Sequence, residues 1–462
     1  MTVWMNDLET LDREQLRNLQ ARRLRELLTA VRGRHEYWGR RLKESDLDPD
    51  RVTLESFRDF PLSSKADLLA DQQAAPPWGS RYAPVAGQAA HVYETSGTSG
   101  LGQEAIALTP HEVEKRGSAY PFIFSWAGLE PGDSMLLTLP ISMQSGGQTY
   151  STGAVQFGLT CFASGTYDAR KKIDLLSKYE ITALLASPTY INRLEVVARE
   201  MGLDPATSFP ALTNILTFAE PYPQSWPEQV AKAWGVRRVS EQWGLAQAGS
   251  VTITCENGCV TRPDGQRPMM HSLGAHTYLE VLDPATGEPV APGEWGEMVV
   301  TRLFTHRNPM IRFRTGDKGK FLPAEYCPCG RPFDGIECGT VGRYDDMMKI
   351  RGMNVFPSAI DDIVLGGMVE EYRGTVDVDS GGSEQVEILL DFGRRAESLT
   401  GEETSAYIRQ VERSIKERVG ITVAVRTAPA NSLPRFEFKA RRWTDSRRRD
   451  RKVIAYTEDG AK

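Results

Sequence analysis

The chain has 462 residues, of which 40% are hydrophobic and 25% are charged, and its formal net charge is −6. This length predicts about three domains or subdomains, and the composition is typical of a globular protein and excludes a disordered one. The negative charge argues against nucleic acid as a partner. The absence of an apolar run of about 20 residues argues against a membrane span, and Met1–Asp7 shows no secretory pattern. We therefore expect a cytoplasmic monomer or homodimer.

The N-terminal region is predicted to be helical. Leucines recur at helical spacing between Asp12 and Leu42, which predicts one long surface helix with a single apolar face. Ser64 precedes a second helical pattern and is expected to be its N-cap.

From residue 111 onward, helical and strand patterns alternate. Helices are predicted over 111–126, 147–157, 170–179 and 191–201, and strands over 134–139, 159–162, 183–186, 214–218 and 238–240. This alternation predicts an α/β fold whose parallel sheet is covered by helices on both faces. Between Tyr278 and Phe321 the pattern changes to short alternating strands with glycine-containing turns, which predicts a β-subdomain.

A stretch rich in hydroxyls and glycine lies between two predicted strands, Ala89–Tyr93 and Ile106–Thr109, which we expect to pair as a hairpin. We call this stretch the phosphate loop, and its residues are Thr95, Ser96, Gly97, Thr98, Ser99 and Gly100. Its backbone N–H groups and hydroxyls could converge on a phosphate, although an ordinary polar hairpin turn fits the same residues. It lacks the Gly-Lys-Ser/Thr ending of a Walker loop.

Several predicted strands of the α/β region end in unusual residues, at the sheet edge where open parallel sheets place their ligands. Phe218–Pro221 ends one strand, and Glu241–Gln247 follows the next. The aromatic–glycine pair Trp243-Gly244 could stack a purine, or it could simply pack in the core. Further along, the carboxylate of Asp317 in an Arg-Thr-Gly-Asp turn could accept hydrogen bonds from ribose hydroxyls. The Arg-Thr-Gly-Asp turn alone is weak evidence for a nucleotide site, but the evidence becomes strong because the segment Gly342–Pro357 follows the turn.

These motifs occur in the order found in adenylate-forming enzymes, and Leu433–Ala440 closes the series. The chain resembles the phenylacetate–CoA ligase family over most of its length, to about Asp445. The resemblance implies a large N-terminal domain, residues 1–345, and a small mobile α+β domain, residues 346–462. It also implies activation of an aryl or arylacetic acid by ATP to give acyl-AMP, followed by transfer to CoA.

The resemblance implies roles for particular residues. The phosphate loop would bind the ATP phosphates, Asp317 the ribose, and Arg343 the nucleotide. Lys439 would bridge the carboxylate and the α-phosphate, and Asp345 would be the hinge of the small domain. Adenine would be held by Ala219, Glu220, Pro221, Gln242, Trp243, Gly244 and Leu245. The acid pocket is expected to be lined by Met143, Ser145, Gly146, Gly147 and Tyr222.

Two positions depart from the family pattern. Gln247 stands where the family has a glutamate that binds Mg²⁺, and a neutral amide is a poorer ligand for this cation. Phe438 replaces the glycine that precedes the lysine. Two alternatives stay open: a ligase of the same class that uses an amine acceptor or activates nitrite, and a non-catalytic nucleotide-binding homologue, which Gln247 would suit.

The six cysteines include a tight Cys327-Pro-Cys329 knuckle. With Cys255 and His271 upstream, this set suits a closed tetrahedral zinc site, and some family members carry zinc here. Cys259 competes with Cys255 as the fourth ligand, and unmetallated buried thiols remain an alternative. The other cysteines, Cys161 and Cys338, are interpreted as small core residues.

Overall fold

The computed structural model describes residues 7–83, 90–95, 103–218, 220–344, 348–351, 353–355, 357–365, 367–378, 384–393, 396, 399–434 and 442–447. These residues fall into two compact units, a large one within 7–344 and a small one within 348–447. In this described part of the chain, no helix combines the length and the apolar character that a membrane crossing requires.

The N-terminal helical region consists of two helices, α1 (Arg13–Arg32) and α2 (Glu36–Glu44). The prediction of one helix over residues 12–42 was wrong, because α1 ends at Gly33, whose backbone is not helical (φ −118°, ψ 2°). Glycine favours helix ends because it loses the most conformational freedom inside a helix. Ser64 caps α3 (Lys65–Ala74), as predicted.

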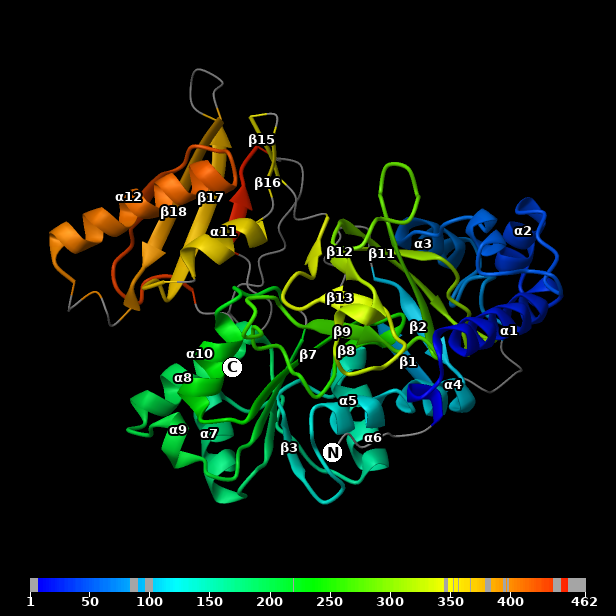
Figure 1. Cartoon of the computed structure of the whole chain (residues 1–462), viewed down its shortest axis with the longest axis horizontal. Helices are drawn as coiled ribbons and strands as arrows, with labels where there is room; N and C mark the ends of the chain where they lie inside the picture. The colour runs from blue at the N-terminus through cyan, green and yellow to red at the C-terminus, as the bar shows by residue number, and fades with distance from the viewer. Residues whose placement is uncertain are drawn as a thin grey trace. The chain divides into compact units, whose positions relative to one another are not determined.

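The centre of the large unit is a 12-stranded mixed sheet (Figure 1). Five of its strands are parallel in the order β4-β3-β5-β6-β7, which confirms the predicted parallel sheet. These strands are β3 (Ser134–Leu137), β4 (Thr160–Ala163), β5 (Ala183–Leu185), β6 (Asn214–Phe218) and β7 (Arg238–Leu245). Strand β7 is longer than predicted, so Glu241–Leu245 lies within it and does not follow it.

The rest of the sheet is antiparallel and continues from β7 in the order β8-β9-β13-β12-β11-β10. The predicted β-subdomain is present as β10 to β12, but hydrogen bonds join it to the parallel strands in one sheet. The bounds are β8 (Gly249–Thr254), β9 (Met269–Ser272), β10 (Thr277–Leu282), β11 (Trp295–Arg302), β12 (Phe313–Leu322) and β13 (Gly335–Glu337), with β14 (Gly342–Arg343) paired to β12.

The helix predicted over residues 111–126 is divided into α4 (Pro110–Gly117) and α5 (Tyr120–Trp126), so this prediction was wrong. Pro121 has no N–H to donate to the preceding turn, which interrupts a continuous helix. The other three predicted helices are confirmed as α6 (Ser145–Phe157), α7 (Ala169–Lys178) and α8 (Pro188–Glu200). The sequence analysis missed α9 (Pro205–Ser208) and α10 (Trp226–Trp234).

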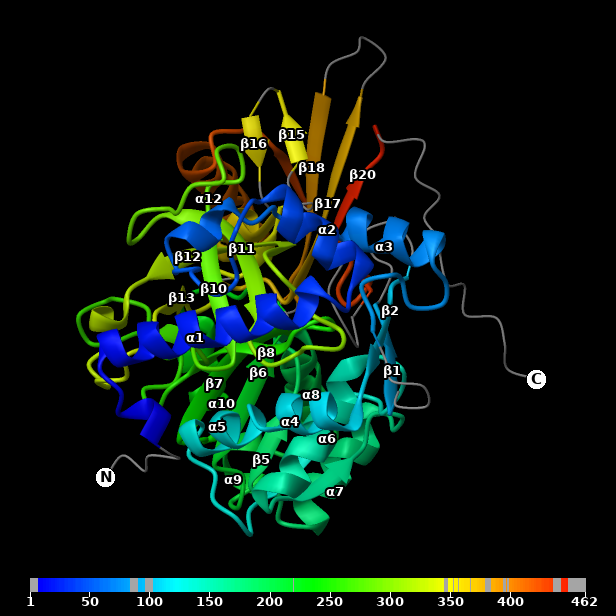
Figure 2. The ribbon, with the colours of Figure 1, turned by 90° about the vertical axis from the view of Figure 1, so that its right-hand side faces the viewer.

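Successive side chains of the parallel strands point to opposite faces of the sheet, and a separate core covers each face. Leu136 and Leu184 contribute to a core shared with α7, α8 and α10, whereas Leu137 and Leu185 contribute to one shared with α5 and α6. Figure 2 shows the ribbon turned by 90° about the vertical axis. Burial of both faces explains why the inner strands β3 and β5 read as continuous apolar runs.

The small unit is an α+β fold with its own core. Its four-stranded sheet has the order β19-β18-β17-β20, and a two-stranded hairpin, β15-β16, lies outside that sheet. The elements are β15 (Met348–Ile350), β16 (Met353–Val355), α11 (Pro357–Val364), β17 (Glu371–Val378), β18 (Glu384–Asp391), α12 (Gly401–Arg418), β19 (Ala424–Thr427) and β20 (Trp443–Asp445). This confirms the predicted fold class of a large α/β domain with a small α+β one.

Candidate functional site

The strands on either side of the phosphate loop form the expected antiparallel hairpin, β1 (His91–Glu94) with β2 (Ala105–Leu108). Thr95 and Glu104 continue this pairing. The Thr95 N–H donates to the carbonyl of Glu104 at 3.0 Å, and the Glu104 N–H donates to Oγ1 of Thr95 at 2.9 Å. The remaining loop residues, Ser96, Gly97, Thr98, Ser99 and Gly100, lie outside the described residues. The hairpin thus fixes the point from which the loop begins.

Three residues predicted to hold the nucleotide come together from three strands, β7, β12 and β14. Trp243 on β7 donates its indole Nε1–H to Oδ2 of Asp317 at 3.0 Å. Arg343 on β14 lies with Nη1 3.3 Å from Oδ1 of the same carboxylate, and the two residues are register partners. The Asp317 carboxylate is therefore held from both sides in a fixed orientation. A carboxylate so held is suited to accept hydrogen bonds from a pair of hydroxyl groups.

The strand β7 approaches β8 closely beside Trp243. A Cβ atom added to Gly244 would lie 2.2 Å from the carbonyl oxygen of Gly249, so only glycine fits there. The register also shifts between Trp243 and Gly244. Upstream in the strand, Oε1 of Gln242 accepts a hydrogen bond from the Ser250 hydroxyl at 2.8 Å. Leu245, the last residue of β7, is half-buried.

The other residues predicted around adenine lie after β6. Oε2 of Glu220 accepts a hydrogen bond from the backbone N–H of Thr189, in the first turn of α8, at 3.1 Å. A carboxylate at a helix N-terminus is stabilised by the helix dipole. Pro221 is half-buried, and Ala219 lies outside the described residues.

The predicted acid-pocket residues lie at two places. Met143 is 50% exposed, and its carbonyl accepts a hydrogen bond from the Glu94 N–H at 2.9 Å, next to the phosphate loop. Ser145, Gly146 and Gly147 form the first turn of α6, and a Cβ atom on Gly147 would lie 2.1 Å from the carbonyl oxygen of Pro140. Tyr222, by contrast, is buried in the core and donates its hydroxyl to Glu241.

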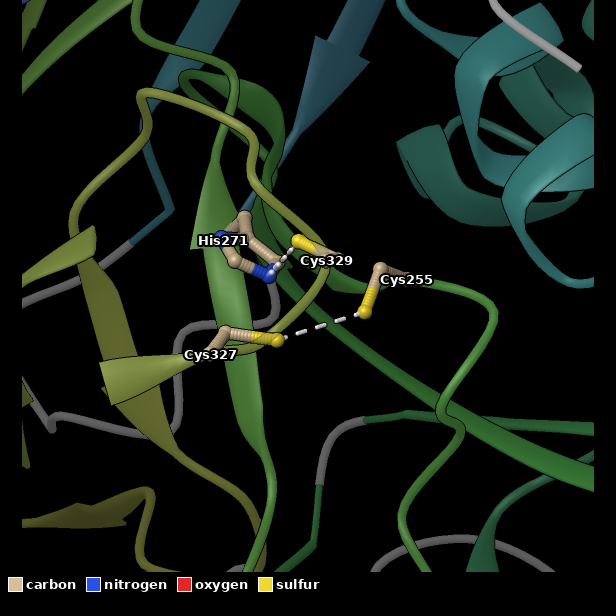
Figure 3. Close-up of side chains that lie close together, drawn as sticks. All are labelled: Cys255, His271, Cys327 and Cys329. Atoms are coloured by element: carbon tan, nitrogen blue, oxygen red, sulfur yellow. Dashed lines mark hydrogen bonds between the residues drawn. The ribbon is translucent and has the colours of Figure 1, made fainter. Parts of the chain in front are cut away.

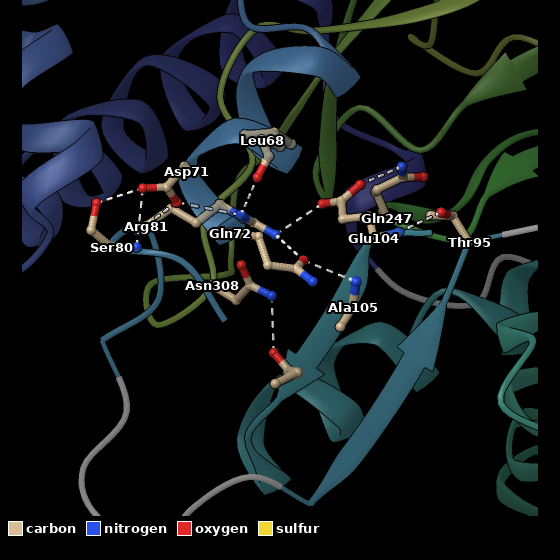
Figure 4. A network of polar contacts seen from close by, with 11 residues as sticks. Leu68, Asp71, Gln72, Ser80, Arg81, Thr95, Glu104, Ala105, Gln247 and Asn308 are labelled. Atoms are coloured by element: carbon tan, nitrogen blue, oxygen red, sulfur yellow. Dashed lines mark hydrogen bonds and ion pairs between the residues drawn. The ribbon is translucent and has the colours of Figure 1, made fainter. Parts of the chain in front are cut away.

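A buried polar network that the sequence analysis did not identify lies next to Thr95 (Figure 4). The Glu104 carboxylate accepts a hydrogen bond from Nη2 of Arg81 at 3.2 Å and from Nε2 of Gln247 at 2.9 Å. Arg81 also contacts Oδ2 of Asp71 at 3.3 Å. Each charged member is at most 9% exposed. Gln247 was singled out from the sequence, but its partners could not be identified because they are distant along the chain.

Magnesium, which the family implies, prefers carboxylate oxygens. At position 247 the side chain is an amide whose nitrogen donates to Glu104, so the ionisable oxygens at this place belong to Glu104. Both oxygens of this buried carboxylate already accept hydrogen bonds, from Arg81 and from Gln247, so the described residues at this place do not fit a divalent cation.

The four predicted metal ligands converge (Figure 3). Cys255 follows β8, His271 lies on β9, and Cys327 and Cys329 follow the short helix η3 (Ala324–Tyr326). Their ligand atoms all lie within 4.8 Å of one another. The sulfurs of Cys255 and Cys327 are 3.7 Å apart, and Sγ of Cys329 is 3.4 Å from Nε2 of His271. Zn–S bonds of about 2.3 Å in a tetrahedron place two sulfurs about 3.8 Å apart, so the set fits zinc.

The surroundings of this cluster also suit a metal. His271 donates its Nδ1–H to the carbonyl of Phe333 at 2.9 Å, and its Nε2 lies 3.4 Å from Sγ of Cys329, so the ring is oriented as in a metal-binding histidine. Hydrogen bonds from the Cys255 and Cys327 thiols lower the pKa of Cys329 well below its usual range, which favours a thiolate. Cys259 lies outside the cluster, because its thiol donates to the carbonyl of Val239 at 3.1 Å.

Three residues singled out in the C-terminal part of the sequence analysis lie outside the described residues. They are Asp345, the predicted hinge, Lys439, the predicted catalytic lysine, and its neighbour Phe438. Their assignments rest on the sequence.

Comparison with known proteins identifies the family. The AMP-binding enzyme family matches residues 35–305, and the AMP-binding enzyme C-terminal domain matches residues 352–447. The chain is 30% identical to a phenylacetate–coenzyme A ligase of Thermus thermophilus, over 96% of this chain and 100% of the relative. It is 26% identical to the Escherichia coli enzyme of the same name, over 96% of this chain and 98% of that relative.

A solved structure has the same fold. The crystal structure of 2-hydroxyisobutyryl-CoA ligase in the postadenylation state aligns with a TM-score of 0.87 at 24% identity, over 97% of this chain and 93% of that one. This likeness shows the shared fold, and the sequence matches confirm the predicted resemblance. The chain belongs to the AMP-binding enzyme family, in its phenylacetate–CoA ligase branch.

Proposed function

We propose that this protein is an AMP-forming acid–CoA ligase that acts on an aryl or arylacetic acid. In the first step the acid's carboxylate attacks the α-phosphorus of ATP, which gives acyl-AMP and releases pyrophosphate. In the second step the CoA thiol attacks the acyl carbon, which gives the thioester and releases AMP. The names of the full-length relatives support the class of acid and the acceptor.

The observation that carries this proposal is the Asp317 carboxylate, held by Trp243 at 3.0 Å and by Arg343 at 3.3 Å. Asp317 would accept both ribose hydroxyls, and Arg343 would add positive charge beside the nucleotide. Gly244 and the neighbouring residues of β7 would present backbone polar groups to adenine. The nucleotide is thereby fixed at its ribose before the reaction begins, which lowers the entropic cost of aligning the reactants.

Catalysis needs positive charge where negative charge develops between the acid and the α-phosphate. Lys439 would supply it during adenylation, and the phosphate loop would bind the departing pyrophosphate through its hydroxyls and N–H groups. Magnesium, when bound with ATP, would neutralise phosphate charge. The small domain, residues 346–462, would turn about Asp345 between the two steps, so that Lys439 leaves the site and CoA can enter.

The cysteine cluster would hold a structural zinc ion through Cys255, His271, Cys327 and Cys329. Its geometry supports a closed site, because protein ligands fill all four positions of the tetrahedron. Such an ion would tie β8, β9 and the segment after η3 together. It would take no part in either reaction.

The test is to measure pyrophosphate release and thioester formation with a panel of aryl, arylacetic and short aliphatic acids. We expect acid-dependent pyrophosphate release with the aryl or arylacetic members, and thioester only when CoA is added. Turnover that requires an amine in place of CoA would contradict the assigned acceptor. Absence of pyrophosphate release with every acid would contradict the proposal itself.

A further inference from the structure

The strongest unassigned feature is a pair of buried arginines, Arg116 on α4 and Arg302 at the end of β11. Their exposed fractions are 2% and 1%. Nη2 of Arg116 donates to the carbonyl of Ala246 at 2.9 Å, and Nη1 of Arg302 donates to the carbonyl of Gln247 at 3.1 Å. Both guanidinium groups are therefore held beside the turn that follows β7, the strand that leads into the candidate nucleotide site.

Most of the donor capacity of these two groups is not used by the protein. Among the described residues, Nε and Nη1 of Arg116 and Nε and Nη2 of Arg302 are buried and have no hydrogen-bond partner. Arg116 lies over the ring of Tyr93, 5.0 Å from its centroid, and Arg302 lies 4.5 Å from the ring centroid of Phe304. A ring face attracts a cation, but less strongly than a carboxylate does. Buried donors normally have an acceptor, so these four nitrogens indicate oxygen atoms supplied by a ligand.

The charge around the pair is also unbalanced. No ion pair between described residues includes Arg116 or Arg302. The acidic side chain whose charge acts on Arg302 is Glu112, and its two oxygens accept hydrogen bonds from the backbone of Thr109 and of Arg307. Burial, and then the neighbouring charge of Arg116, lower the pKa of Arg302 to about 9, so this side chain is still a cation at neutral pH. One positive charge is left in excess, which a bound anion would balance.

The pair lies close to the helix that begins with predicted acid-pocket residues. That helix, α6, starts with Ser145–Gly147, and Tyr150 lies about one turn further along the same face. The ring of Tyr150 contacts the ring of Tyr120, with centroids 5.1 Å apart, and the charge of Arg116 acts on the Tyr120 hydroxyl. The Tyr150 hydroxyl is also buried without a hydrogen-bond partner among the described residues. Aromatic rings and polar donors thus connect the predicted acid pocket to Arg116.

We propose that Arg116 and Arg302 bind a second carboxylate on the acid substrate, which would therefore be a dicarboxylic aryl or arylacetic acid. Nε and Nη2 of Arg302 lie on one edge of the guanidinium, and two parallel N–H donors on one edge match the two oxygens of a carboxylate. Arg116 would donate to the same group from α4. The two arginines would determine which acid binds, and the carboxylate that they hold would not be the one activated. This proposal rests on the proposed function, because it takes the first carboxylate to react with ATP.

The test compares acids that differ only in the second carboxylate. Phenylacetate is compared with its meta- and para-carboxy derivatives, and benzoate with isophthalate and terephthalate. The readout is equilibrium binding to the full chain by calorimetry, without ATP or CoA. At least one dicarboxylic acid should bind about tenfold or more tightly than its parent, because hydrogen bonds between charged groups are strong. Arg116→Met and Arg302→Met should each remove most of this preference, whereas Arg237→Met, at an exposed arginine, should retain it.

Melting temperatures separate this role from a structural one. Replacing a buried cation that has no anionic partner by an apolar side chain should leave the melting temperature unchanged or raise it. Arg312→Met is the contrast, because Arg312 is also buried but donates to both carboxylate oxygens of Glu280. Its loss leaves a buried carboxylate unpaired and should lower the melting temperature. If neither Met variant folds, Arg302→Lys tests the proposal, because it keeps the charge but loses the paired donors and most of the preference.

Four results would overturn the proposal. They are the absence of tighter binding by every dicarboxylic acid, a preference that survives both Met substitutions, a fall in the melting temperature of both Met variants as large as that of Arg312→Met, and stabilisation of the wild type by inorganic phosphate that equals stabilisation by the dicarboxylic acids. The last result would show that the arginines take up a free anion only. A protein that shows the preference but releases no pyrophosphate with any acid would refute the proposed function alone.

Discussion

Trp243 donates its indole Nε1–H to Oδ2 of Asp317 at 3.0 Å, and this bond joins β7 to β12 in the candidate nucleotide site. The two strands are not neighbours in the sheet. The bond therefore fixes the Asp317 carboxylate, which is proposed to bind ribose, relative to the Trp243 ring, which is proposed to bind adenine.

We predict that Trp243→Phe weakens ATP binding by about tenfold, since a hydrogen bond to a charged group contributes about 1.5–3 kcal/mol. The ring is retained, so only the donor is lost. The measurement is ATP affinity by calorimetry, together with the KM for ATP. Trp226→Phe is the matched control, because that indole donates to Oδ1 of Asn192 at 2.9 Å on another part of the unit. An equal effect of both substitutions would show that the loss of an indole donor acts through general stability.

The cysteine cluster predicts that the purified protein carries a single zinc ion. Cys327→Ser should release the metal and lower the melting temperature, because the binding free energy of a structural zinc contributes to folding. Cys259→Ser is the control, since Cys259 is also buried but donates its thiol to the carbonyl of Val239 outside the cluster. The measurements are elemental analysis and thermal unfolding. Protein prepared without chelator that contains no zinc would refute the site.

We predict that the titration of Glu241 makes the free energy of unfolding depend on pH. Burial raises the pKa of Glu241 to about 7, although hydrogen bonds from Tyr222 and from the Gly339 N–H oppose the increase. Because the folded pKa lies above the unfolded value, the contribution of Glu241 is fully present below about pH 4.5 and is lost as the pH rises through 7. Glu241→Gln cannot titrate. The free energy of unfolding of the wild type relative to this variant should therefore fall by about 3 kcal/mol over that range.

Urea denaturation of both proteins between pH 4.5 and pH 8 measures this difference. Tyr222→Phe removes a donor to the carboxylate and should raise the pKa of Glu241 further, so the fall should continue to higher pH in that background. A constant difference in the free energy of unfolding between the wild type and Glu241→Gln across this pH range would show that the pKa of Glu241 is not raised.

The fold was largely predictable because its signals are local. The inner strands β3 and β5 of the parallel sheet are buried on both faces and appear as apolar runs, and Ser64 marks a helix start. Gly33 is also a local signal, because glycine favours helix ends, and it marks the boundary between α1 and α2 that the predicted single helix lacks. By contrast, Glu104 and Gln247 are 143 residues apart, and neither has a neighbour that indicates the other. Glu104 precedes a strand of the two-stranded sheet and Gln247 follows a strand of the 12-stranded sheet, so their contact depends on how two sheets pack together, which no local pattern specifies. The metal ligands were found because cysteine spacing is itself a signal.

Lys439 carries the last prediction, which separates the two half-reactions. A cation placed between the carboxylate and the α-phosphate stabilises charge that develops only during adenylation, and such a group is worth about 3 kcal/mol or more in comparable sites. Lys439→Ala should therefore slow acyl-AMP formation by about 100-fold or more. Thioester formation from supplied acyl-AMP should be nearly unchanged, because the lysine has no partner in that step. Rapid-quench measurement of each half-reaction checks both expectations, with Lys416→Ala on α12 as a control for loss of a lysine from the small domain. Equal loss of both half-reactions would contradict the assignment of Lys439 to the first step.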